Sequence, residues 1–303
     1  MLKIGMIGLG DIAQKAYLPV MSSRPEVELH LYTRDQDKLA RIGQQYRYKH
    51  LHPSLDSLLN SGIKGAFVHG ATEVHAELVE QLLQHNIDVY VDKPITYSYA
   101  SSRALVDLAK SKGLILMTGF NRRYAPAYQK LKELAEPNVV IMQKNRLNQP
   151  ADVRTFIFDD FIHVVDTLRY LFPYTVEQLV VNGRIEQGLL HHVTIQLFSA
   201  SGATAIGIMN RDSGTNEEKV EVMNSTEKRV AYNVSDVMVL QGREKIQLGA
   251  SDWEPTLYKR GFEQIVADFL QTVETGTSPR FSAKDALATH ELCERIVEEL
   301  TKR

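Results

Sequence analysis

The first 120 residues alternate between short apolar runs and longer amphipathic stretches, and this alternation limits the possible folds more than any other feature of the chain. Apolar, β-branched runs predict strands at residues 2–8, 27–33, 64–69, 87–92 and 114–120. Apolar positions with a 3.6-residue period predict helices at residues 11–23, 35–45, 72–84 and 98–112, with a short helix starting near Ser54. Strands that alternate with helices predict an α/β fold, a doubly wound parallel sheet with right-handed crossovers.

The pattern changes after Phe120. Helices are predicted at residues 126–136, 159–171, 254–274 and 283–301, with a strand at residues 139–145 and a run of strands between residues 176 and 248. Strands that follow one another without helices between them indicate a mainly antiparallel sheet, and so a second domain of the α+β class. We therefore predict two domains, residues 1–121 and residues 122–303.

Composition excludes several classes of protein. The 303 residues carry a formal net charge of −2, with acids and bases spread along the chain, which gives no reason to expect nucleic-acid or membrane partners. No apolar run approaches the roughly 18 residues that a membrane span needs, and the N-terminus enters a strand without a signal peptide. The single cysteine, Cys293, fits a reducing compartment. The sequence predicts a cytoplasmic protein.

A glycine-rich loop follows the first strand directly. Gly8-Leu9-Gly10-Asp11-Ile12-Ala13 reads G-x-G-x-x-A, between a strand and a helix. Gly8 permits the tight turn, Gly10 lets the backbone approach a pyrophosphate, and Ala13 keeps the helix close to the sheet. The N–H groups at the helix start, from Asp11 and Ile12 onward, suit phosphate. The alternative is a glycine turn that binds nothing, but its position in a βαβ unit favours a Rossmann dinucleotide site.

The end of the second strand bears on the choice of cofactor. An acid here would bind the ribose 2′-hydroxyl of NAD, but this chain has Thr33 and Arg34. A hydroxyl followed by a guanidinium suits the 2′-phosphate of NADP. Asp35 follows and either serves the ribose or caps the next helix, and Arg34 could also be a solvated loop residue. The pattern favours NADP over NAD.

Two further strand ends carry candidate residues. Lys93, in Asp92-Lys93-Pro94, ends a parallel strand at the edge where open α/β sheets bind ligands, and Pro94 restricts its conformation. Whether the Lys93-Pro94 bond is cis stays open at this point. Near residue 72, Thr72 is either a helix cap or a cofactor contact, and His75 is predicted to border the nicotinamide half of the cofactor.

A polar stripe lies on the helix predicted at residues 159–171. Asp159, His163 and Asp166 fall on one face at i, i+4 and i+7. A carboxylate beside an imidazole orients it and prepares a general base, and Asp160 competes for this role. The alternatives are ordinary acids at a helix start with a hydrogen-bonded histidine, and a metal site that no further histidine cluster or cysteine spacing supports. We predict no metal.

Polar residues also mark the junction between the predicted domains. Asn121, Arg122 and Arg123 follow an apolar strand and either contact substrate or cofactor phosphate, or form an exposed junction. Tyr124 either lines the cleft or packs the linker. We take Lys93, Asn121, Arg123, Tyr124 and Asp160 as candidate substrate contacts.

In combination these motifs resemble the Gfo/Idh/MocA family of NAD(P)-dependent oxidoreductases, in particular its MviM-type branch. The resemblance rests on G-L-G-D-I-A, on V-D-K-P in the family's E-K-P position, on G-F-N-R-R-Y-A-P, and on D-D-F-I-H-V-V-D-T, with later support from R-G-F-E-Q-I-V-A-D-F and S-A-K-D-A-L. It covers essentially the whole chain. Asp92 replaces the usual glutamate and Phe161 stands where the family often has glycine, which leaves the substrate's shape in doubt.

The resemblance implies a Rossmann domain followed by a domain with an open, mainly antiparallel sheet that often forms a dimer. It implies hydride transfer between NAD(P) and a hydroxyl carbon of a sugar, cyclitol or related polyol. Lys93 then matches the E-K-P lysine, and Asp159 and His163 match the aspartate and histidine of the D-x-G-x-H motif. We expect His163, oriented by Asp159, to take the hydroxyl proton, and Lys93 to hold the same oxygen and relay the proton. The alternatives are a non-catalytic NAD(P)-binding regulator and NAD-assisted glycoside cleavage.

Overall fold

Two compact units make up the chain. The computed structural model describes residues 1–249, 251 and 253–302, and contacts between Cα atoms group Met1–Gly119 with Phe262–Ala288, and Phe120–Gly261 with Thr289–Arg303. The division predicted from the sequence, residues 1–121 and 122–303, assigns Phe262–Ala288 to the second domain instead, and it stays a prediction. None of the described helices is long and apolar enough to cross a membrane.

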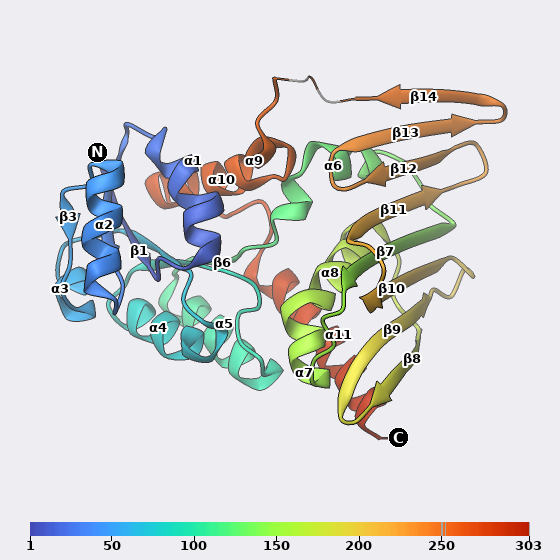
Figure 1. Cartoon of the computed structure of the whole chain (residues 1–303), viewed down its shortest axis with the longest axis horizontal. Coiled ribbons are helices and arrows are strands. Elements are labelled where there is room, and N and C mark those ends of the chain that lie inside the picture. Colours follow the sequence, from blue (N-terminus) through green and yellow to red (C-terminus); the bar gives the residue numbers. More distant parts are fainter. Residues whose placement is uncertain (250, 252, 303) are drawn as a thin grey trace. The chain divides into compact units, whose positions relative to one another are not determined.

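The first unit contains a six-stranded parallel sheet in the order β3-β2-β1-β4-β5-β6 (Figure 1). Its strands are β1 (Leu2–Ile7), β2 (Val27–Tyr32), β3 (His50–Leu51), β4 (Gly65–Val68), β5 (Asp88–Val91) and β6 (Leu116–Thr118). The chain proceeds outward from β1 in one direction and returns to β4 on its other side, so the crevice beyond the ends of β1 and β4 is a topological switch point. This confirms the predicted Rossmann fold.

The helices of this unit are η1 (Ala13–Tyr17), α1 (Leu18–Ser22), α2 (Gln36–Tyr46), α3 (Leu55–Leu59), α4 (Thr72–Gln84), α5 (Tyr99–Lys112) and α10 (Phe262–Thr275). The side chains of Asp35, Ser54 and Ser98 cap the starts of α2, α3 and α5. Gly113 ends α5 with a φ of 65°, as predicted. Thr72 as the cap of α4 is wrong, because the cap residue is Ala71 and makes no side-chain hydrogen bond.

Helix α10 completes the core of the first unit although it lies near the end of the chain. The ring of Phe269 packs on Phe67 of β4, with centroids 4.9 Å apart, and on Tyr90 of β5 at 5.6 Å. A side chain at Gly65 would place its Cβ 3.2 Å from Phe269, so this glycine lets the helix approach the sheet closely. These aromatic contacts explain why Phe262–Ala288 groups with the first unit.

The second unit contains an open eight-stranded sheet in the order β14-β13-β12-β11-β7-β10-β9-β8. Its strands are β7 (Val139–Leu147), β8 (Gln178–Glu186), β9 (Leu189–Phe198), β10 (Thr204–Ser213), β11 (Glu217–Met223), β12 (Lys228–Tyr232), β13 (Asp236–Gln241) and β14 (Glu244–Leu248). Among the described strands, β7 and β10 pair in parallel and the other neighbours are antiparallel. The predicted, mainly antiparallel α+β sheet is confirmed.

The second unit also contains helices, and α6 and α8 among them pack against this sheet (Figure 1). Its helices are η2 (Asn121–Tyr124), α6 (Pro126–Lys132), α7 (Val153–Thr155), η3 (Phe156–Phe161), α8 (Ile162–Leu171) and α9 (Thr256–Lys259), and α11 (Ala283–Thr301) contributes its residues from Thr289 onward. A Cβ at Gly207 of β10 would lie 2.9 Å from Leu168 and 3.0 Å from Val164, so α8 lies directly on the sheet. This contact fixes the helix that carries the predicted stripe.

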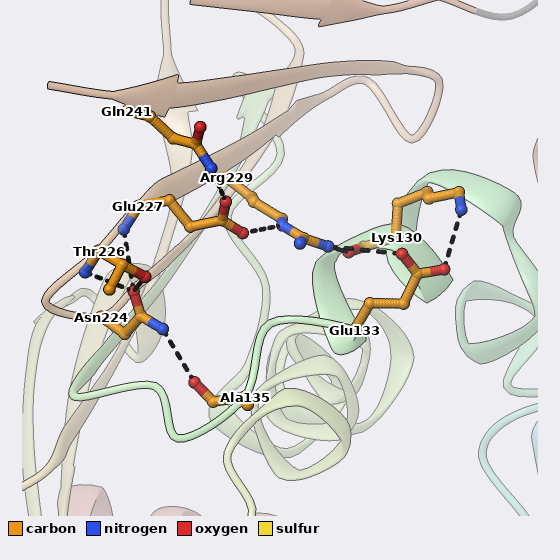
Figure 2. A network of polar contacts seen from close by, with 8 residues as sticks. All are labelled: Lys130, Glu133, Ala135, Asn224, Thr226, Glu227, Arg229 and Gln241. Atoms are coloured by element: carbon orange, nitrogen blue, oxygen red, sulfur yellow. Dashed lines mark hydrogen bonds and ion pairs between the residues drawn. The ribbon is translucent and has the colours of Figure 1, made fainter. Parts of the chain in front are cut away.

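Polar contacts hold α6 against the β11–β12 hairpin and β13, as Figure 2 shows. Arg229 of β12 donates to Glu227 and to the backbone carbonyl of Lys130, and Gln241 donates to the other oxygen of Glu227. Asn224 donates to the carbonyl of Ala135. Because α6 follows η2 directly, this network also limits the movement of residues 121–124.

Candidate active site

The glycine-rich loop of the first unit borders a cavity of about 340 Å³. Four of the predicted cofactor residues line it, namely Gly8, Gly10, Thr33 and Arg34. The end of β4 supplies further lining that the prediction did not include, among it His69, Gly70 and Ala71. The cavity therefore lies at the carboxyl ends of β1, β2 and β4, where a Rossmann fold binds its dinucleotide.

Gly8 is required by the backbone itself. Its φ is +87°, and a Cβ there would lie 2.6 Å from the backbone nitrogen of Gly70. At Gly10 the nearest atom to a Cβ would be the carbonyl oxygen of His69, 3.9 Å away, so this position leaves room for a ligand. The amide of Gln14 braces the loop by donating to the carbonyl of Leu9 at 2.9 Å. A loop of this shape fits a pyrophosphate that approaches the main chain closely.

Basic residues line the cavity beyond β2. Arg34 and Lys38 both reach it beside Thr33. The carboxylate of Asp35 accepts from the backbone N–H of Lys38 at 2.9 Å and lies 3.5 Å from the ammonium of Lys38, so it acts as the helix cap. Of the two roles open to Asp35, the contacts favour capping over ribose binding.

Besides His75 and Lys93, which are described below, four predicted cofactor residues are not among those that line this cavity, namely Asp11, Ile12, Ala13 and Thr72. Asp11 is exposed and pairs with Lys15 at 2.8 Å. Ala13 is completely buried, which agrees with its predicted packing role. Cofactor contacts by the four stay predictions.

His75 holds the loop that carries Lys93. The Nδ1 atom of the buried His75 ring lies 2.9 Å from the carbonyl oxygen of Pro94, and its Nε2 lies 3.0 Å from that of Gly70. The Lys93-Pro94 bond is cis, and the backbone N–H of Lys93 donates to Asp92 at 2.8 Å. The geometry thus gives His75 an anchoring role, and its contact with the cofactor stays a prediction.

Asp92, which stands where the family has glutamate, is held within the same loop. Burial raises the pKa of Asp92, although the charge of Lys93, the N–H of Lys93 and the charge of His75 act in the opposite direction. A Cβ at Gly119 would lie 2.9 Å from its Oδ1. The side chain of Asp92 is therefore packed against the end of the neighbouring strand, and it accepts a hydrogen bond from the backbone N–H of Lys93.

His69 is a feature that the prediction missed. Its ring stacks on Tyr17 with centroids 3.9 Å apart, and neither ring nitrogen has a hydrogen-bond partner among the described residues. Burial, with a smaller effect of His75, lowers the pKa of His69 to about 3, so the ring is neutral near pH 7. A histidine at the end of a strand, in V-H-G-A-T, is the signal that sequence reasoning could have used.

In the second unit, His163 lies just after a π-helical segment, at the start of an α-helix. Residues Phe156–Phe161 are π-helical and Ile162–Leu171 is α-helical, so Asp159 and Asp160 lie in the wider turn and His163 in the regular one. His163 is buried, and both aspartates are half-buried. The Nδ1 atom of His163 lies 2.7 Å from Nη1 of Arg122, a contact that sequence reasoning did not foresee.

Arg122 is itself fixed by a buried carboxylate. Its Nε and Nη2 each donate to Glu218 at 2.7 Å, and the hydroxyl of Tyr128 donates to the same carboxylate at 2.5 Å. Burial alone would raise the pKa of Glu218, but Arg122, together with Lys144 and Tyr128, brings it to about 2. Glu218 is thus a carboxylate at neutral pH, and it balances the charge of Arg122.

A lysine lies on the same covered face. Lys144 follows Val140 and Met142 in the inward alternation of β7 and is opposite Glu218 of β11. Its ammonium pairs with Asp160, which Arg146 also contacts at 3.2 Å. Burial and the charge of Arg122 lower the pKa of Lys144 to about 7, although Asp160 opposes this change. The alternation V-V-I-M-Q-K predicts this inward lysine, so the sequence contained the signal.

The other candidate substrate residues are held by contacts within the protein itself. Arg123 donates to Asp166 at 2.9 and 2.6 Å, so the third member of the predicted stripe is an ion-pair partner. Asn121 donates to the carbonyl of Arg260 at 2.8 Å, and Tyr124 is buried. Asp160 is occupied by Lys144. This geometry supports structural roles, and substrate contacts by these residues stay predictions.

One group of histidines in the first unit has metal-ligating atoms close together. Glu28, His30 and His50 offer ligand atoms within 4.8 Å of one another. The ring of His30 already contacts Glu28 at 3.0 Å and His52 at 2.9 Å, and His52 contacts Ser57 at 2.9 Å. These hydrogen bonds satisfy both ring nitrogens of His30 without an ion, so the arrangement is accounted for by a chain of hydrogen bonds and does not require a metal.

Comparison with known proteins agrees with this geometry. Residues 2–120 match the family described as an oxidoreductase family with an NAD-binding Rossmann fold, and residues 126–245 match the YceM-like C-terminal domain. The chain is 34% identical to the oxidoreductase YceM of Salmonella typhimurium, over 99% of this chain and 97% of that protein. It is 25% identical to the myo-inositol 2-dehydrogenase of Thermotoga maritima, over 94% and 92%. The crystal structure of the dehydrogenase MviM from Clostridium difficile superposes with a TM-score of 0.94 at 30% identity, over 98% and 99%.

Proposed function

Because the chain belongs to the Gfo/Idh/MocA family of NAD(P)-dependent oxidoreductases and to its MviM-type branch, we propose that it moves a hydride between NAD(P) and a hydroxyl carbon of a sugar, cyclitol or related polyol. The protein is an NAD(P)-dependent dehydrogenase. The observation that carries the proposal is the cavity at the switch point of the first sheet, bordered by Gly8 and Arg34. The choice of a polyol is supported by likeness, over nearly the full length, to an enzyme named for acting on myo-inositol.

The cavity residues fit a dinucleotide. The positive φ of Gly8 and the open position at Gly10 leave the main chain accessible to a pyrophosphate, and the start of the following helix supplies N–H groups. When bound, the nicotinamide accepts or gives the hydride. Arg34 and Lys38 beside Thr33 supply positive charge where an adenosine 2′-phosphate would lie, and Asp35 is occupied as a cap. These contacts support a preference for NADP.

Lys93, His163 and Asp159 carry the acid–base chemistry in this proposal. Oxidation of an alcohol requires that the hydroxyl proton leave as the hydride leaves the carbon. The backbone N–H of Lys93 donates to the neighbouring Asp92, which holds Lys93 in place, and His163 is held by Arg122. A fixed side chain serves this role better than a mobile one, since catalysis depends on preorganised hydrogen bonds to the reacting oxygen.

The compartment and the assembly are part of the same proposal. We expect a cytoplasmic homodimer, because Cys293 is a buried free thiol and strands of the second unit's sheet carry exposed apolar side chains such as Val180 and Ile246. Light scattering of the purified chain tests the dimer directly.

A panel of sugars, inositols and sugar acids, each supplied with NAD⁺ and with NADP⁺, tests the function by following cofactor reduction. Turnover should be lost in Lys93→Ala and His163→Ala while cofactor affinity is kept, and the exposed Lys110→Ala is the matched control. Cofactor binding without turnover of any compound would support a regulator instead. Consumption of a glycoside without net cofactor reduction would support redox-assisted cleavage.

A further inference from the structure

The contact between Arg122 and His163 restricts where the imidazole can carry its proton. A guanidinium has only N–H donors and does not lose its proton in proteins. With Nη1 of Arg122 2.7 Å from Nδ1 of His163, that ring nitrogen must accept. A neutral ring whose Nδ1 accepts carries its single proton on Nε2. The observed distance therefore specifies one tautomer.

The partners of Arg122 prevent the opposite arrangement. Its Nε and Nη2 both donate to Glu218, whose carboxylate also accepts from Tyr128. The side chains of Arg122 and Glu218 are each 9% exposed, so water does not readily replace a lost contact. Turning the His163 ring over would set a carbon against the guanidinium and leave a buried N–H without its acceptor, which is unfavourable.

This tautomer limits what His163 can do to a substrate. Protonation of Nδ1 would set one N–H against another, so the ring cannot accept a proton there while Arg122 is in place. Loss of the Nε2 proton would create an imidazolate anion. The ring can then only donate a hydrogen bond from Nε2, as a neutral histidine does when it polarises a carbonyl oxygen in other enzymes.

We propose that Arg122 is a positioning residue that holds His163 as the Nε2–H tautomer, so that His163 donates a hydrogen bond to the reacting oxygen and Lys93 takes the proton. This assignment rests on the proposed function. In the oxidative direction the C–H bond would break with its electron pair going to a bound nicotinamide, the O–H electron pair would form the carbonyl, and the hydroxyl proton would pass to the side-chain nitrogen of Lys93. It replaces the expectation from the sequence that His163 is the base.

Nitrogen NMR of the whole chain, labelled with ¹⁵N-histidine, reads the tautomer without substrate or cofactor. The His163 signals are identified by their absence in His163→Gln. We expect a bare, pyridine-type Nδ1 and a protonated, pyrrole-type Nε2 in the wild-type protein. A proton on Nδ1, or on both nitrogens, overturns the proposal whether or not a substrate is known.

Variants then test the part played by Arg122. Arg122→Met removes the donor and should give a mixture of tautomers, whereas Arg122→Lys keeps a donor-only group and should retain Nε2–H. Arg184→Met, an exposed arginine of β8, is the matched control and should leave the His163 signals unchanged. Signals in Arg122→Met identical to those of the wild type would contradict the positioning role. If that variant does not fold, the wild-type spectrum still decides the tautomer.

Kinetics separates the two roles of His163 once a substrate is found. A glutamine side chain reaches the position of Nε2 and donates a hydrogen bond there but is no base, so His163→Gln should keep kcat within about tenfold of the wild type, while loss of a general base costs about 10²–10⁴-fold. Lys93→Met should show that larger loss. A fall of 10²-fold or more in kcat for His163→Gln would restore His163 as the base and leave the proposed function intact.

Discussion

Glu218→Gln tests the buried charge network around Arg122. The substitution keeps the shape of the side chain but removes the negative charge that faces Arg122, Tyr128 and Lys144. A pKa for Glu218 that falls from 4.5 to about 2 on folding corresponds to about 3 kcal/mol of folding free energy, at about 1.4 kcal/mol for each pH unit. Loss of one partner of a buried ion pair independently predicts about 3–5 kcal/mol.

The pH dependence of this effect has a defined sign. The native protein binds the Glu218 proton less tightly than the unfolded chain does, so the contribution is complete above pH 4.5 and is lost as the pH falls toward 2. The difference in unfolding free energy between wild type and Glu218→Gln should therefore be about 3 kcal/mol at pH 7 and less than half of that at pH 3.

Denaturant unfolding followed by far-UV circular dichroism at pH 7, 5 and 3 measures this difference. Glu186→Gln is the matched control, because its ion pair with Arg184 lies on β8 of the same sheet with side chains about half exposed, and it should cost less than about 1 kcal/mol at every pH. A cost below 1 kcal/mol for Glu218→Gln at pH 7, or a cost that does not fall with pH, would refute the reasoning about the network.

Three further predictions concern Lys144 of this network and two residues of the cofactor cavity, Gly8 and Arg34. The pKa of Lys144 falls from 10.5 to about 7 on folding, so the unfolded chain holds more protons than the native protein between these pH values. The free energy of unfolding should therefore rise by about 2 kcal/mol from pH 7 to 9, and Lys144→Met should remove this rise in denaturant unfolding. An equal rise in both proteins would contradict this prediction. Gly8→Ala forces a Cβ to within 2.6 Å of Gly70 at a φ of +87°, so it should cost about 1–3 kcal/mol in thermal unfolding and weaken cofactor binding at least about tenfold; unchanged affinity would exclude the loop from the site. Arg34→Ala should raise the Kd of NADP⁺ about tenfold or more by fluorescence titration with NAD⁺ changed less than threefold, and equal effects on both cofactors would remove the case for NADP.

Much of the first unit could be predicted because its determinants are local. Five of its six strands and the helices between them follow from hydrophobic period, and Gly8 and Gly113 mark positions that need positive φ. The two-residue strand β3, at His50–Leu51, carries too little pattern to be predicted. Helix α10 was predicted as a helix, but its place against β4 and β5 depends on contacts between residues far apart in the sequence.

The second unit shows where local pattern is insufficient. The spacing of Asp159, His163 and Asp166 suggested one shared polar face, but the π-helical turn and the pairing of Asp166 with Arg123 give these residues different surroundings. The partner of His163 comes from Arg122, 41 residues earlier, and the partner of Arg122 comes 96 residues later. The register of β7 with β11 sets this arrangement, and one sequence does not encode strand register in a readable form.

Transfer of deuterium from substrate to cofactor tests directly whether the protein moves a hydride. The compound of the panel that reduces the cofactor fastest is supplied deuterated at its hydroxyl-bearing carbons, and the reduced cofactor is isolated and analysed by mass spectrometry. We expect one deuterium in each reduced nicotinamide, with no reduction in Lys93→Met. Reduced cofactor without deuterium, or no reduction by any compound although both cofactors bind, would contradict hydride transfer by this protein.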